Sequence, residues 1–231
     1  MRYYQIIGGD NSNRLASNEL IIEIASEDFT KNTYKLIKTI KERSCMNPDI
    51  ILDYFTPFTT AEEGGYNLII SDWMIIISST LKWAVLISEK MFDVCINYWN
   101  NNCPEYYRAT LKHNSQDLPY YLILFRKEHI DLVFNFNSAK FMVKSFSDDT
   151  YNIEYDLSCS DFRDFKKNVT TLFLNNNDHL LYIDLIKLRL PVNLFAFLDT
   201  SIWIISEDLY EELKFIDLTG VKFVPFDRVI F

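Results

Sequence analysis

The chain has 231 residues, of which 48% are apolar and 16% aromatic, and its formal net charge is −9. This length and apolar content suit one compact unit with a sizeable core, or two small domains packed closely together. A surface with this excess of carboxylates repels phosphate backbones, so nucleic-acid binding is not expected. The same surface would attract a basic protein.

The first part of the chain predicts short strands and one helix. Strands are expected over 2–7 and 20–25, a helix over 33–43 and an extended segment over 50–54. The apolar run over 67–78 favours a strand through its isoleucines, although Asp72 could cap a short helix there. Residues 1–66 are interpreted as an amino-terminal β/α segment packed on an α+β unit over 67–231, with no clear linker between them.

Two later segments share one pattern, an apolar strand followed by Ile-Ser-Glu and an amphipathic helix. In the first, Ser88 follows an apolar run over 83–87, and in the second, Ser206 follows a run over 202–205. A serine hydroxyl in this place can accept a hydrogen bond from the free amides of the following helix, so both serines are predicted as helix caps. The pattern indicates an internal duplication, with the alternative that any capped strand–helix–strand segment looks alike.

Further elements lie around and between the two units. Strands are expected over 107–112, 119–125, 130–136, 142–146, 151–155, 169–174 and 180–186. A short helix is expected over 161–167. The strands over 142–146 and 151–155 are expected to form a hairpin. After the second helix, Gly220 predicts a turn, and Pro225 predicts that the following strand lies at a sheet edge or ends there.

The amino-terminal stretch has no long apolar run and no cleavage-site pattern, so no secretory signal is expected. Apolar runs elsewhere are too short to cross a bilayer, and no membrane association is predicted. The chain has four cysteines, Cys45, Cys95, Cys103 and Cys159, and none of them has the spacing of metal ligands. We therefore expect a cytoplasmic protein with free thiols, in which Cys95 acts as a small hydrophobic residue on a helix face.

Residue types that carry catalysis form no recognisable pattern. The three histidines, His113, His129 and His179, each lack a second ligand at metal-binding spacing. No nucleophile elbow, dinucleotide fingerprint or P-loop is present. The sequence therefore predicts no catalytic, metal or cofactor-binding residue and no cofactor. A cryptic hydrolase stays as an alternative, because folding can bring distant residues together.

One acidic stretch is the predicted partner-binding site. Its carboxylates are Asp148, Asp149, Glu154, Asp156, Asp161 and Asp164. A clustered acidic rim can steer a basic protein partner into place. The alternative is that these side chains form an ordinary solvated face.

Three segments resemble a bacterial immunity-protein family of polymorphic toxin systems, long catalogued as a domain of unknown function. They are WAVLISEKMFD over 83–93, LPYYLILFRKEHIDLVFNFNSAKF over 118–141, and the terminal unit over 203–226 with Ile-Ser-Glu and Leu-Thr-Gly-Val-Lys-Phe-Val-Pro. Residues 1–66 lie outside the resemblance. It implies a non-enzymatic protein that binds and neutralises a cognate toxin. The alternative is a non-catalytic adaptor module of a secretion system.

The predicted elements amount to an α+β fold of mainly antiparallel sheet with a few packed helices. Two related strand–Ser-capped helix–strand units are expected within it, and the whole chain is expected to form one compact unit. The oligomeric state, the identity of the toxin and the face that binds it are left open by the sequence.

Overall fold

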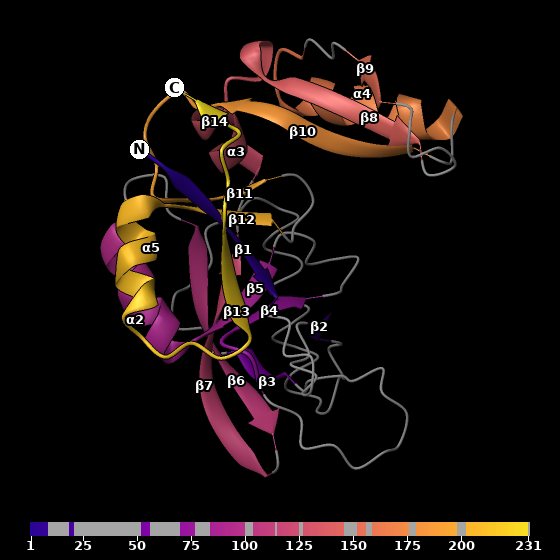
Figure 1. Ribbon diagram of the computed structural model, residues 1–231. Helices are drawn as coiled ribbons and strands as arrows, with labels where there is room; N and C mark the ends of the chain where they lie inside the picture. The colour runs from indigo at the N-terminus through magenta and orange to yellow at the C-terminus, as the bar shows by residue number, and fades with distance from the viewer. Residues whose placement is uncertain are drawn as a thin grey trace.

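The structure is a computed structural model that describes residues 1–8, 19–20, 52–55, 70–76, 84–99, 104–113, 115–124, 127–145, 152–155, 159–175, 179–197 and 202–230. These residues form helices and mainly antiparallel sheets, which is the predicted α+β class (Figure 1). The helix expected over 33–43 lies outside the described residues, as does most of the strand expected over 20–25.

The largest sheet has six strands in the order β2-β4-β5-β7-β6-β3. Their bounds are Glu19–Leu20, Trp73–Ile76, Ala84–Ser88, Gln116–Leu124, Glu105–His113 and Leu52–Phe55. The four inner strands are antiparallel, whereas β2 and β3 join at the edges in parallel. The ambiguous run over 67–78 therefore contains a strand, β4.

A second, fully antiparallel sheet has the order β11-β12-β1-β13. Its strands are Leu194–Phe197, Ile202–Ser206, Tyr3–Gly8 and Val221–Pro225. The amino-terminal strand β1 thus lies between two strands from the other end of the chain. β2 and β3 likewise pair with strands from the later part of the chain. Pro225 ends an edge strand of this sheet order, as predicted.

The third sheet, β14-β10-β8-β9, lies beyond the second one in Figure 1. Its strands are Val229–Ile230, His179–Lys187, Lys140–Ser145 and Asn152–Tyr155. β8 and β9 pair antiparallel, which confirms the predicted hairpin pairing. The helical elements of this region are α3 over Lys127–Val133, the 3-10 turn η1 over Phe136–Ser138 and α4 over Phe162–Asn175.

Two expected strands are helical in the structure. The segment over 130–136 contains the end of α3 and the start of η1, and its buried residues Ile130, Val133 and Phe134 follow helical spacing. The segment over 169–174 is the second half of α4. Hydroxyl groups of Thr170 and Thr171 donate to carbonyls four residues earlier, an arrangement that β-branched threonine uses within helices. Strand propensity therefore did not decide the structure of either segment.

Two hydrophobic cores lie on opposite faces of the sheet that contains β1. Trp203 and Ile205 of β12 point into a core shared with α2 (Glu89–Tyr98) and α5 (Glu207–Lys214). Ile204 points the other way, into a core shared with α3, η1 and α4. The first core also takes residues from β5 and β7 of the large sheet. The adjacent helices α2 and α5 thus form one layer that serves both sheets (Figure 1).

The two strand–helix–strand units have the same connectivity. β5 and β6 flank β7, and β12 and β13 flank β1, with antiparallel pairing in each case. The register also agrees, because Ser88 lies opposite Tyr120 and Ser206 lies opposite Tyr3. The units differ in chain order: β7 follows β6 through a tight turn, whereas its counterpart β1 comes from the amino-terminal end.

The aromatic packing repeats as well. Phe92 of α2 stacks on Tyr121 of β7 with ring centroids 3.6 Å apart, and Tyr210 of α5 stacks on Tyr4 of β1 at 3.9 Å. Each helix residue lies four positions after the serine at the start of its helix. A third ring from the flanking strand adjoins each pair, Tyr106 in the first unit and Phe223 in the second. The repetition therefore extends from connectivity to side-chain contacts.

Candidate protein-interaction surface

The two serines stand at the helix starts. Ser88 Oγ accepts a hydrogen bond from the Met91 amide at 3.4 Å, and Ser206 Oγ accepts one from the Leu209 amide at 3.3 Å. Ser206 also donates to Asn193 Oδ1 at 3.0 Å. These bonds give both hydroxyls a structural role, because each satisfies an amide that the first helical turn leaves free.

Part of the predicted acidic site lies at the start of α4. Asp161 Oδ1 accepts from the Asp164 amide at 2.8 Å, and Asp164 Oδ2 accepts from the Ser160 amide at 3.1 Å. Asp131, which sequence reasoning did not single out, accepts from the Phe162 amide at 2.8 Å. The three carboxylates therefore bind the positive end of a helix, although Asp161 is also exposed.

The other predicted carboxylates are not brought into this group by any described contact. Glu154 lies in β9, whereas Asp148, Asp149 and Asp156 are outside the described residues. A continuous acidic rim formed by all six therefore stays a prediction.

A second group of exposed acidic residues, which sequence reasoning missed, lies on α2, α5 and the loop after α5. The two helices and the loop that follows α5 carry seven carboxylates and two lysines, a net charge of −5. The carboxylates are Glu89, Asp93, Glu207, Asp208, Glu211, Glu212 and Asp217, all exposed except the half-buried Glu207. In α5, the carboxylates alternate with the buried Leu209 and Leu213 at helical spacing. That pattern is the sequence signal that could have identified an acidic helix face.

One of the two lysines is held from within the protein. Lys90 Nζ pairs with Asp72 Oδ2 at 2.9 Å and also donates to the Asp217 carbonyl. The Asp72 residue is only 5% exposed, and its carboxylate accepts from the Thr219 amide. Because the charge of Lys90 is matched by this buried carboxylate, it offsets the exposed carboxylates less than its count suggests.

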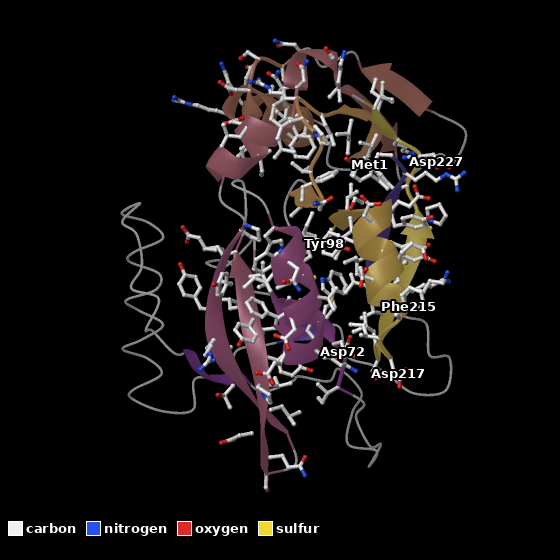
Figure 2. All side chains as sticks on the ribbon, turned by 90° about the vertical axis from the view of Figure 1, so that its left-hand side faces the viewer. Met1, Asp72, Tyr98, Phe215, Asp217 and Asp227 are labelled. Atoms are coloured by element: carbon white, nitrogen blue, oxygen red, sulfur yellow. The ribbon has the colours of Figure 1, made fainter. Side chains whose placement is uncertain are left out.

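Phe215 lies at the exposed end of this surface. It follows the last turn of α5 with helical backbone angles, and its amide donates to the Glu212 and Leu213 carbonyls. Its side chain is 83% exposed, the highest value among the large hydrophobic residues described. A phenylalanine left in water forgoes about 1.5–3 kcal/mol of burial free energy. The ring therefore lies where a partner could bury it, next to Asp217 (Figure 2).

The loop beyond Phe215 is anchored to the large sheet. The Asp72 amide donates to the Thr219 carbonyl at 2.9 Å, and Ser71 Oγ donates to the Gly220 carbonyl at 3.1 Å. Gly220 has a φ of 68°, the left-handed conformation that glycine adopts without strain, as the sequence predicts. Phe215 is consequently displayed from a firmly bonded segment, which reduces the ordering entropy that binding would cost.

The opposite end of the helix pair is bonded in a related way. Asn193 Nδ2 donates to the Tyr98 carbonyl at the end of α2. The pKa of the Tyr98 hydroxyl is raised by partial burial and by the charge of, and hydrogen bond to, Glu212 of α5. Polar contacts at both ends thus hold α2 and α5 side by side as one surface.

Within the described residues, no group of three or more histidine, cysteine, aspartate or glutamate side chains is placed to hold a metal ion. No helix in the described part of the chain is long and apolar enough to cross a membrane. The chain matches no protein-family model, no curated protein and no solved structure.

Proposed function

We propose that this chain is an immunity protein that neutralises a cognate bacterial toxin by binding it directly in the cytoplasm, without transforming a substrate. The observation that carries the proposal is the exposed acidic face of the α2–α5 layer with Phe215 at its end. The resemblance of residues 83–93, 118–141 and 203–226 to the immunity family supports the same function. The first of these segments contains the first half of α2, and the third contains all of α5.

The mechanism follows from the chemistry of this face. Its carboxylates would speed encounter with a basic toxin surface, because opposite potentials steer diffusing partners together. The buried part of the contact would then slow dissociation, which governs most affinity differences between related complexes. Neutralisation results from covering the toxin's functional surface.

Growth rescue tests this function. The chain is co-expressed with the toxin encoded beside its gene in a susceptible host, and an unrelated toxin serves as the control. We expect growth to be restored with the cognate toxin alone, and the purified proteins to form a stable complex. A folded chain that leaves growth inhibited contradicts the proposal. If that chain still binds the toxin, the result favours an adaptor of the secretion system.

A further inference from the structure

The two helices of the α2–α5 layer can be compared position by position, because they occupy equivalent places in the two units. Counting from Ser88 and Ser206, the third residues are Met91 and Leu209, and the seventh are Cys95 and Leu213. All four are completely buried in the same core. The inner faces of the two helices therefore pack in the same way. Differences between their exposed residues can be compared directly, because the two helices have the same place in the fold.

The outer faces differ. On α5 and the residue that ends it, exposed positions at helical spacing hold Asp208, Glu211, Glu212 and the C-cap residue Phe215. The same positions on α2 hold Lys90, Asp93, Val94 and Asn97. Formal charge along the first set is −3, and along the second it is zero. Equivalent positions thus carry three exposed carboxylates and an aromatic end in one unit, against one exposed carboxylate and a lysine paired with the buried Asp72 in the other.

At the last position, Asn97 lies within α2, whereas Phe215 is the residue that ends α5. Asn97 is exposed, and its amide nitrogen donates to the Asp93 carbonyl at 2.8 Å, which satisfies the side chain within its own helix. Its counterpart Phe215 is 83% exposed. Since Phe215 is left exposed, and a polar residue stands at the same count from the serine in α2, the packing of the layer gives no reason for an aromatic ring at the end of α5.

We infer that the outer stripe of α5, formed by Asp208, Glu211, Glu212 and Phe215, is the docking surface for a basic protein with an apolar pocket for the Phe215 ring. Charge complementarity selects this occupant. The three carboxylates leave a net negative charge even though Lys214 pairs with Glu211 at 3.7 Å, so the stripe attracts a basic surface, and the ring supplies the anchor. The inference deepens the proposed function, on which it rests for naming the occupant as the toxin. The α2 stripe takes no part in docking.

Binding measurements with the purified toxin test the stripe. Phe215→Asn, which copies the α2 residue, is expected to weaken affinity about 30-fold, mainly by faster dissociation, as for an anchor residue. Asp208→Asn combined with Glu211→Gln and Glu212→Gln is expected to slow association about 10-fold and to flatten its salt dependence. Asn97→Ala is the matched control and should leave both rates unchanged. Unaltered melting temperatures establish that the variants are folded.

Photocrosslinking separates this inference from the proposed function. A photoreactive phenylalanine analogue is placed at position 215 or at position 97, and adducts formed in the native cells are identified. We expect adducts at 215 alone, with a protein whose surface is basic and whose purified form loses affinity for Phe215→Asn. Three results would overturn the assignment of the stripe as the docking surface, even where growth rescue succeeds. They are equal adducts at both positions, no adduct at 215, and a captured protein whose affinity is unchanged by Phe215→Asn. A basic partner without toxin activity supports the stripe and contradicts the immunity function.

Discussion

Ser206 is fully buried, and its hydroxyl joins segments that are far apart in the chain. It accepts from the Leu209 amide and donates to Asn193 Oδ1, and the Asn193 amide nitrogen then reaches the Tyr98 carbonyl of α2. One small side chain thus caps α5 and connects it to the other helix of the layer. Ser88 has the simpler role, since the described bond of its hydroxyl is to Met91.

Replacing Ser206 with alanine should lower the free energy of unfolding by about 1–2 kcal/mol. The Leu209 amide loses its cap, and the Asn193 oxygen is left without its buried donor. Urea denaturation measures the effect, with Ser88→Ala as the matched control and an expected loss near 1 kcal/mol. Toxin binding at low denaturant should be unchanged. A loss of binding at full stability would assign Ser206 a functional role instead.

Cys95 makes stability depend on alkaline pH. Its thiol is completely buried, and burial raises its pKa from 9.0 to about 12. The unfolded chain loses this proton near pH 9 while the folded chain keeps it. Stability is therefore fully present below pH 9 and falls as the pH rises towards 12, by about 1.4 kcal/mol per pH unit for this group.

The test compares the Cys95→Ala variant with the unchanged chain. The free energy of unfolding of each is measured by urea denaturation between pH 8 and pH 11. The variant should be less stable at pH 8. Its free energy of unfolding should fall less steeply with rising pH, and the difference between the two slopes should be about 1.4 kcal/mol per pH unit. Tyr3, whose pKa is also raised by burial to about 12, keeps part of the decline in both proteins. Parallel curves for the two proteins would contradict the assignment to Cys95.

At the scale of elements, β1 is the strand on which the second sheet depends. It pairs with β12 on one side and β13 on the other, and its side chains reach both cores. Tyr3 packs with Phe195 on one face, and Ile6 is completely buried on the other. A short amino-terminal segment therefore carries interior packing that its position in the chain does not suggest.

Truncating Ile6 to alanine should lower the free energy of unfolding by about 2–5 kcal/mol, the range for a large-to-small change in a filled core. The neighbouring Gln5→Ala, on the opposite face of the strand and half-buried, is the control and should cost well under 1 kcal/mol. Thermal and chemical denaturation measure both. Similar small losses for the two variants would show that β1 is not a central strand.

At the scale of the whole molecule, two units of one connectivity share the α2–α5 layer, and they differ in how the central strand is supplied. The Phe226 amide donates to the Tyr3 carbonyl at 2.8 Å, so the end of β13 lies beside the start of β1. Met1 and Asp227 also lie at the same end of the molecule (Figure 2). The end of β13 and the start of β1 therefore lie together at the place that the β6–β7 turn takes in the other unit.

A circular permutant tests this relation. Phe231 is joined to Met1 by a short glycine–serine linker, and the chain is opened between β1 and β2. β1 then comes after β13 in the chain, with the short β14 between them, just as β7 comes after β6. We expect an unchanged circular dichroism spectrum and cooperative unfolding, because all strand pairs of the second sheet are kept. Opening the chain within β12 is the control and should prevent folding. A disordered permutant would contradict the equivalence of β1 and β7.

What the sequence alone could establish was local. Ser88 and Ser206 are recognisable as helix starts, and Gly220 as a left-handed turn, because each effect acts within a few residues. The alternating strands of the two units follow for the same reason. Local propensity failed over 130–136 and 169–174, where apolar and β-branched residues predict strands but the backbone is helical.

Only the tertiary structure decided how the units combine and which acidic surface is displayed. The carboxylates of α5 are visible in the sequence, but their position beside α2, with Lys90 matched by the buried Asp72, arises from contacts between distant segments. The sequence likewise contains Phe215 without revealing that it is exposed. Its exposure, like the place of β1, depends on long-range packing, because a residue's neighbours in space are set by the whole fold rather than by adjacent residues.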